Sequence, residues 1–294
     1  LVADCAAGRG FMLDPLFAEA WGRVLADKAL DGSLKSLALL LPSERELALA
    51  MEIVDPDAIH EAHMFVRCEL ARMFRAELVE TYEATASTEP YAIDKPNIDR
   101  RRLRNTVLAC LATLEEPVIT DFAYRQFQKA DNMTEVQAAL TALVELDVPE
   151  RNQALEAFYT KWETDALVID KWFTVQATSG HPATVDHVLA LSKHPAFTLK
   201  NPNRARSLIG AFGMGNHVRF HSADGRGYLF LADSVLELDG SNPQVASRMA
   251  SCFNQWKRYD ADRQDKIGTQ LERIACKEGI SKDVYEIVSR ALQN

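Results

Sequence analysis

Closely spaced histidines are the first residues to test for chemistry, because they are common ligands of zinc in proteins. His60-Glu61-Ala62-His63 places two histidines three residues apart. The zinc motif H-E-x-x-H places them four apart, so that both rings lie on one helical face with the glutamate between them. This segment is one residue short, and no third ligand is evident nearby. We therefore predict a histidine in the core at His63, a surface histidine at His60, and no metal site.

Other short motifs give no catalytic apparatus. His217 and His221 are four residues apart, but they lie in a glycine-flanked segment that favours a loop. The segment 210–215, Gly-Ala-Phe-Gly-Met-Gly, follows no predicted strand, so we do not expect it to bind phosphate. The cysteines are scattered with no C-x-x-C spacing, which indicates buried free thiols in a reducing cytosol: Cys5, Cys68, Cys110, Cys252 and Cys276.

The charge balance argues against nucleic acid as a partner. The chain has 42 acidic and 33 basic residues, a formal net charge of −9, whereas phosphate contacts need a basic face. The run Arg100-Arg-Arg-Leu-Arg104 is short and has no interleaved aromatic residues, so we interpret it as a solvated helix face with local ion pairs. No apolar run is long enough for a membrane span, and no signal peptide is recognisable. These features predict a cytoplasmic protein with no membrane partner.

The elements that hold these residues are predicted from the dominant pattern of the chain, in which apolar residues recur at intervals of three and four. The clearest helix begins at Asp55-Pro56, where aspartate can cap the free amides and proline suits the first helical position. We expect it to run for nearly eight turns. Its predicted apolar face consists of Ile59, His63, Val66, Leu70, Met73 and Leu78.

Similar start signals recur along the chain. Asn201-Pro202 and Asn242-Pro243 repeat the cap-proline pair, Ser43 to Glu46 fits a capping box, and Ser281 is a further cap. With 13 Gly and 11 Pro in 294 residues, breaks fall mostly every 10–20 residues. The segment around Asp224-Gly225 fits either a β-hairpin or a helix, and we favour the helix because Tyr228 and the apolar residues after it keep a helical period. The pattern predicts an all-α fold, a superhelical α-solenoid of stacked antiparallel helix pairs.

Several ordered motifs then resemble one family, the bacterial M1-family zinc aminopeptidases of the aminopeptidase N type. The strongest are N-P-N-R-A-R-S-L-I-G-A-F at 201–212, D-G-R-G-Y-L-F-L at 224–231, N-P-Q-V-A-S-R at 242–248 and K-R-Y-D at 257–260. Shorter matches precede them in the same order, at 132–134, 170–173 and 176–178, with faint ones at 55–59 and 103–105. The similarity therefore extends over nearly the whole chain.

The resemblance is to the C-terminal helical domain of that family, an armadillo-like or HEAT-like superhelix that encloses the active site. It implies that residues 15–294 form this domain and that residues 1–14 are a linker remnant. Because the sequence begins with Leu1 rather than Met, we expect an excised domain. In the family the catalytic zinc and its ligands lie upstream, so the resemblance implies no catalytic residue, no metal ligand and no cofactor on this chain.

The resemblance also implies a function and a set of site residues. The full protein is expected to be a zinc metallo-aminopeptidase that releases N-terminal residues from peptides, with this domain packed on its own catalytic domain and inactive alone. Arg206 and Arg248 are expected to face the substrate channel, and Gln244 to share the face of Arg248, whereas Arg204 is expected to be structural. The alternative is a free-standing helical-repeat scaffold that binds a protein partner on its concave face.

Overall fold

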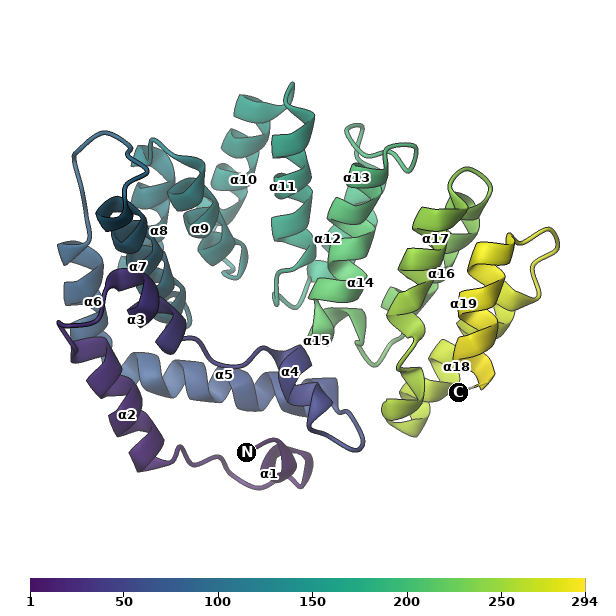
Figure 1. The fold of residues 1–294 in the computed structure, drawn as a ribbon, viewed down its shortest axis with the longest axis horizontal. Helices are drawn as coiled ribbons and strands as arrows, with labels where there is room; N and C mark the ends of the chain where they lie inside the picture. Colours follow the sequence, from purple (N-terminus) through teal and green to yellow (C-terminus); the bar gives the residue numbers. More distant parts are fainter. Residues whose placement is uncertain (294) are drawn as a thin grey trace. The chain divides into compact units, whose positions relative to one another are not determined.

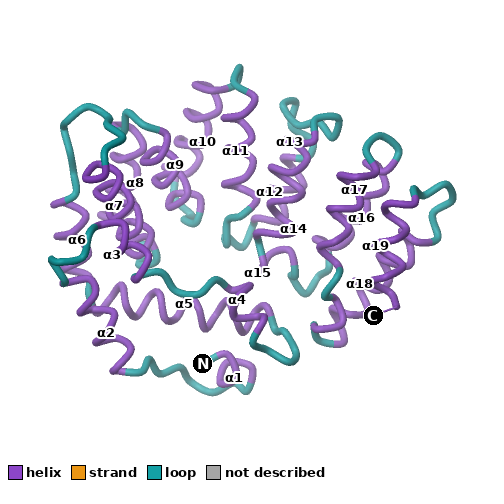
Figure 2. The backbone as a smooth tube through the Cα atoms, viewed as in Figure 1, coloured by secondary structure: helices purple, strands orange, loops and turns teal. Residues whose placement is uncertain are grey.

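The computed structural model describes residues 1–293, and in that range helices follow one another, joined by loops (Figures 1 and 2). No strand occurs among these residues, and their single isolated β-bridge joins Val54 to Tyr259. The all-α prediction is therefore confirmed. The chain divides into two compact units: unit 1 comprises residues 1–43 and 58–157, and unit 2 comprises residues 44–57 and 158–294.

Unit 1 is built mainly from long helices. In chain order they are α1 (Val2–Ala6), α2 (Pro15–Ala26), α3 (Gly32–Ala38), α5 (Pro56–Met73), α6 (Arg75–Ala84), α7 (Lys95–Ala112), α8 (Pro117–Lys129), α9 (Met133–Val144) and α10 (Pro149–Trp162), of which α5 and α10 each run across a unit boundary. Helix α7 packs on α3, α6, α8 and α9. Packing of each helix on its neighbour and on the next but one is the pattern of a helical repeat.

Unit 2 contains shorter helices and several tight turns. Its elements are α4 (Glu44–Leu49), α11 (Ala166–Ala177), α12 (Thr184–Leu191), α13 (Pro202–Ala205), a π-helical turn (Arg206–Gly210), α14 (Ala211–Gly215), α15 (His217–Phe220), α16 (Arg226–Asp239), α17 (Pro243–Ala250), two 3-10 turns (Ser251–Phe253 and Trp256–Arg258), α18 (Ala261–Ala275) and α19 (Lys282–Gln293). Helices α16 to α19 pack as successive pairs, α16 on α17 and α18, and α19 on α17 and α18 (Figure 1).

The predicted start signals are accurate. Helices α5, α13 and α17 begin at Pro56, Pro202 and Pro243, each directly after an Asp or Asn. The Asn242 side chain accepts a hydrogen bond from the Val245 amide at 3.1 Å, and Ser281 accepts one from the Val284 amide at 3.2 Å. These side chains satisfy amides that have no partner inside the first helical turn.

The long helix predicted from Pro56 is wrong in its length. Helix α5 ends at Met73, and α6 starts at Arg75 after Phe74, whose backbone has φ −113° and ψ 27°. The Phe74 ring packs on Trp21 of α2 with 5.5 Å between ring centroids. It also fills the space that a Cβ on Gly22 would need, at 2.4 Å. The break is therefore set by packing between helices, which the apolar period of α5 alone does not encode.

The segment around Asp224-Gly225 forms a helix, as favoured, and not a hairpin. Gly225 adopts φ +72°, a left-handed conformation that glycine enters without steric cost, and α16 follows it directly. Gly227 then lies against the preceding helix, because a Cβ there would be 2.4 Å from the Phe220 carbonyl oxygen. The sequence D-G-R-G thus makes a tight corner between α15 and α16.

The cores of the two units differ in chemistry. The largest fully buried side chains of unit 1 are aliphatic, and include Ile59, Leu78, Leu108, Leu111, Ile119 and Leu140. Those of unit 2 are aromatic: Phe158, Phe173, Phe212, Phe220, Tyr228 and Phe253. Across residues 1–293, no helix combines the length and the apolar character that crossing a membrane requires.

Candidate functional site

Arg204 is the anchor of the N-P-N-R-A-R segment. Its side chain is buried, and its Nε donates to the Asp170 carboxylate at 2.5 Å. The same guanidinium donates to the carbonyl oxygens of Ala166 and Ala196 and stacks over the Phe173 ring, 4.9 Å from its centroid. Charge-assisted bonds of this kind are among the stronger ones in proteins. Arg204 therefore has the structural role that was expected of it.

Arg206 is exposed although it lies close in sequence to the buried Arg204. It is two residues after Arg204, at the start of the π-helical turn, and its side chain is exposed. Its Nη1 donates to Asn203 Oδ1 at 3.0 Å, which is its single hydrogen bond within the described chain. The other guanidinium donors of Arg206 face solvent and are available to a ligand.

Gln244 and Arg248 lie one helical turn apart on α17. Both side chains are exposed, whereas Val245 and Met249, one position further along, are buried. A spacing of four residues places Gln244 and Arg248 on one face of the helix. In the part of the chain that the structure describes, the Arg248 guanidinium makes no hydrogen bond or ion pair. The structure thus brings Gln244 and Arg248 together on the surface of unit 2, and it places Arg206 on a different element of that unit.

A second buried arginine, Arg263, forms hydrogen bonds that hold the K-R-Y-D segment (residues 257–260) of unit 2 in place. Arg263 donates to Asp260 at 2.6 Å, to Asp57 at 2.5 Å and to the His221 carbonyl oxygen at 2.7 Å. The two carboxylates raise the pKa of Arg263 against the opposing effect of burial. Arg258 donates to the backbone oxygens of Ala48 and Met51, at 2.9 and 2.5 Å. These contacts hold residues 44–57 against the C-terminal helices of the same unit.

The prediction of two loop histidines is wrong for His217, which begins α15, whereas His221 lies in the turn after that helix and is buried in the core. It is 5% exposed, its Nδ1 is 3.0 Å from the Tyr228 hydroxyl, and its ring stacks on Tyr259 with centroids 4.1 Å apart. Burial lowers the pKa of His221 well below 6.5, and the charges of His217 and Arg263 lower it further. The imidazole is therefore neutral at physiological pH.

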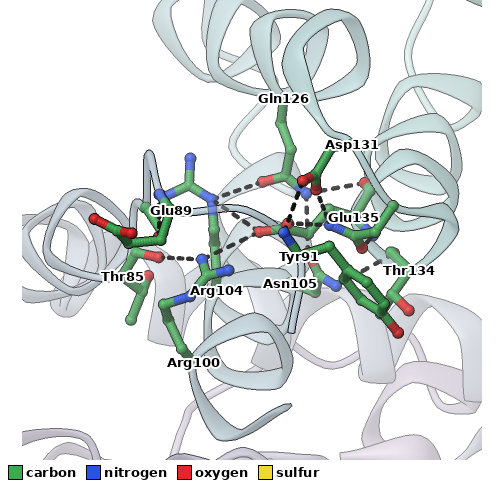
Figure 3. Close-up of polar contacts among 12 residues, drawn as sticks. Thr85, Glu89, Tyr91, Arg100, Arg104, Asn105, Gln126, Asp131, Thr134 and Glu135 are labelled. Atoms are coloured by element: carbon green, nitrogen blue, oxygen red, sulfur yellow. Dashed lines mark hydrogen bonds and ion pairs between the residues drawn. The ribbon is translucent and has the colours of Figure 1, made fainter. Parts of the chain in front are cut away.

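In the arginine run of α7, Arg101 is buried, Arg100 and Arg104 are half-buried and Arg102 alone is exposed, so the predicted solvated face is wrong for three of the four. Arg104 donates to the Tyr82 carbonyl oxygen at 2.5 Å and to Gln126 Oε1 at 3.1 Å, and Arg100 donates to the Thr85 carbonyl oxygen at 2.8 Å (Figure 3). Glu135 lies 3.4 Å from Arg100 and 3.9 Å from Arg104. Two arginines therefore join α6 and α7 to α8 and α9 through a shared polar network.

The spacing of this run contained a signal for its burial. Arg101 and Arg104 lie seven residues before Leu108 and Leu111, both of which are fully buried. Seven residues are close to two helical turns, so each arginine shares the face of a core leucine. Four arginines within five residues suggested a surface, but the apolar period of α7 puts Arg101 and Arg104 on the face of the core leucines, where they are buried and half-buried.

The described residues do not fit a zinc site. His60 and His63 are both half-buried on α5, and Glu61 beside them is exposed. Within residues 1–293, no group of three or more His, Cys, Asp or Glu side chains is arranged to hold a metal ion. A zinc-dependent reaction would need ligands from outside this range.

Comparisons with known proteins converge on one group. The family model described as "Domain of unknown function (DUF3458_C) ARM repeats" matches residues 1–293. Aminopeptidase N of Escherichia coli K12 is 40% identical over 291 residues, and that of Caulobacter vibrioides is 37% identical over 278 residues. These alignments cover 99% and 94% of this chain but 33% and 32% of the relatives, so the chain spans about a third of their length.

A solved structure gives the same picture. The crystal structure of Legionella pneumophila aminopeptidase A in complex with aspartic acid superposes with a TM-score of 0.89 at 28% sequence identity. The match covers 99% of this chain and 35% of the Legionella chain. Similarity at this level extends through both units, including the segments that hold Arg204 and Arg263.

Proposed function

This chain belongs to the family of ARM-repeat domains described as DUF3458_C, and we propose that it serves as the C-terminal domain of a zinc aminopeptidase. In this proposal residues 15–294 pack on a catalytic domain of the same protein, residues 1–14 connect the two, and zinc with its ligands belongs to the catalytic domain. The full protein releases N-terminal residues from peptides. The observation that carries the proposal is the 40% identity to an aminopeptidase N over 99% of this chain.

Within that enzyme, the domain encloses the active-site cavity and lines the path of the peptide. Arg206, Arg248 and Gln244 contact the substrate there. The support for these roles is that all three side chains are exposed, while the motifs around them are held by buried contacts such as the Arg204–Asp170 pair. A guanidinium offers a planar fork of donors that suits peptide carbonyls or a terminal carboxylate.

The first test is the reading frame upstream of the codon for Leu1. We expect an H-E-x-x-H motif a few hundred residues upstream, in the segment that provides the zinc ligands. A start codon adjacent to Leu1 would instead favour the alternative, a free-standing helical scaffold that binds a protein partner.

The second test uses the full enzyme with Arg206→Ala and Arg248→Ala. Each substitution should lower kcat/KM for a peptide more than for an aminoacyl reporter, because the reporter does not extend to the arginines. Arg290→Ala on α19 is a matched control, since this arginine is exposed and pairs with Glu286 at 2.8 Å. Equal losses on both substrates would contradict a role in holding the peptide. The isolated chain should show no peptidase activity.

A further inference from the structure

Unit 1 contains a cavity of about 710 Å³ that the proposed aminopeptidase role does not use. Its walls come from α2, the loop after α3, α5, the loop before α7, α7 itself and the start of α9. Leu39, Leu70 and Ala71 form part of its apolar lining. A cavity of this size matches the range of small-ligand sites, which are mainly apolar with a few polar groups that orient the ligand.

The charge of the cavity is opposite to that of the protein. Arg67, Arg101 and Arg102 line it, and among the lining residues there is no aspartate or glutamate. The whole chain carries a formal charge of −9. A site with three guanidinium groups and no carboxylate, in an acidic protein, is complementary to an anion.

Arg101 gives the strongest indication of a missing partner. Its side chain is 4% exposed, and its Nη1 is buried without a hydrogen-bond partner. Its guanidinium carbon lies 4.6 Å from the centroid of the Tyr91 ring, and its charge is among the causes that lower the pKa of Asp94, which neither bonds it nor lines the cavity. Buried charged groups are costly unless they are paired, so an unpaired guanidinium at this depth points to a ligand that supplies the acceptor.

The cavity mouth is apolar. Leu40, Tyr91, Ile93 and Ile98 line the cavity and are each at least 44% exposed. Large apolar side chains gathered at one opening are typical of a binding site. The ligand therefore needs an apolar body as well as a negative charge.

We propose that this cavity binds a small carboxylate attached to an apolar chain, with the carboxylate on Arg101 and the chain against the leucines and Ile98. A carboxylate matches the planar fork of a guanidinium and carries a single charge. Because the lining residues include no acidic group, the ammonium of a free amino acid would have no counter-charge in the wall, so we expect a carboxylate without an ammonium to bind better. The proposal rests on unit 1 alone and does not depend on the aminopeptidase role.

The test is calorimetric titration of the full chain with four probes. N-acetyl-L-leucine and octanoate should bind, and their relative affinities distinguish an acylated amino acid from a fatty acid as the source. N-acetyl-L-leucinamide should not bind, because it lacks the carboxylate, and free L-leucine should bind more weakly than N-acetyl-L-leucine, because it carries an ammonium. If neither carboxylate binds, or if the amide binds as well as the acid, the proposal is wrong.

Substitutions of arginines test whether the ligand binds in the cavity. Arg101→Met keeps the aliphatic stem and should weaken carboxylate binding by about tenfold or more, the value of a lost charged hydrogen bond. Arg102→Met, at an exposed rim position, should weaken it by roughly threefold. Arg23→Met on α2 is the control, because Arg23 is 78% exposed and does not line the cavity. Unchanged affinity in Arg101→Met would overturn the assignment.

Thermal unfolding separates a ligand-binding arginine from a structural one. A structural Arg101 would make Arg101→Met melt at a lower temperature than the native chain. If Arg101 instead binds a ligand, Arg101→Met should melt at the same or a higher temperature than the native chain. Octanoate should then raise the Tm of the native chain but not that of the variant. A lower Tm in the variant together with an unshifted native chain would contradict the proposal.

Discussion

Unit 1 and unit 2 each bury an arginine to nearly the same depth, but only unit 2 gives that arginine a carboxylate as a hydrogen-bond partner. Arg101 in unit 1 is 4% exposed and has no carboxylate partner, whereas Arg204 in unit 2 is 5% exposed and bonds Asp170. Residue type and burial are therefore not enough to assign a role. What distinguishes them is whether the surrounding helices supply an acceptor, because a guanidinium without one is costly to keep from water.

The largest expected effect is on the paired arginine. Arg204→Met removes the partner of Asp170, which is itself only 15% exposed, and should cost about 3–5 kcal/mol in the free energy of unfolding, as for other broken buried pairs. Urea unfolding followed by circular dichroism measures it. Arg206→Met is the matched control, since Arg206 is exposed, and should change stability by less than about 0.5 kcal/mol. Equal effects of the two substitutions would break the comparison.

The polar network of unit 1 offers the next test. Gln126 accepts from Tyr82 and Arg104 at 3.1 Å each and donates to Asn105 at 2.9 Å. Gln126→Leu keeps the volume but removes the partner of the Arg104 Nε and the Asn105 Oδ1, at about 1–3 kcal/mol for each group that water cannot reach, whereas the Tyr82 hydroxyl keeps the Phe122 carbonyl oxygen.

Urea midpoints check the prediction for Gln126→Leu. Gln128→Leu, at an exposed position of α8, is its control. A loss confined to Gln126→Leu would show that unit 1 depends on paired polar groups in this network even though Arg101 in the same unit has none. No loss would mean that the network of Figure 3 contributes little to stability.

The buried histidine of unit 2 predicts a dependence of stability on pH. The pKa of His221 is lowered well below 6.5 in the folded state by burial, so the unfolded chain binds a proton that the folded chain does not as pH falls below 6.5. Stability should therefore decrease with acidification, by up to about 1.4 kcal/mol per pH unit from this one group.

Denaturant midpoints between pH 7 and pH 5 measure that slope. His221→Gln should flatten it, because glutamine does not titrate. His194→Gln is a useful comparison, since the pKa of His194 is also lowered by burial but the side chain is less deeply placed. A slope that persists unchanged in His221→Gln would mean that other groups govern the acid response.

The smallest expected effect has the opposite sign. Arg101→Met should stabilise the unligated chain by about 1 kcal/mol, because relief of an unpaired buried charge, about 1–3 kcal/mol, exceeds the loss of a cation–π contact, about 0.5–1 kcal/mol. Differential scanning calorimetry gives the sign. Destabilisation would place Arg101 with Arg204 as a structural residue and remove the contrast between the units.

Much of the fold was predictable from local sequence signals. Asn242 and Ser281 cap the helices that they were expected to cap, and the apolar period of three and four produced helices throughout the described chain. Caps and periods work because they depend on residues within one or two turns of each other. The N-P-N-R and D-K-W-F motifs, which supported the family resemblance, hold residues that contact one another although they are 34 positions apart: Arg204 bonds Asp170, and it also lies over the Phe173 ring.

The candidate site was only partly predictable. The sequence by itself determined the helical class and the family, and the family resemblance put forward Arg206, Gln244 and Arg248 as site residues, a role that stays a prediction. The tertiary structure alone decided that α5 stops at Phe74, that His221 lies in an aromatic core, and that Arg101 faces a cavity without a carboxylate. The physical reason is that helix periodicity specifies which face of a helix is inside, whereas the partner of a buried group comes from helices distant in sequence.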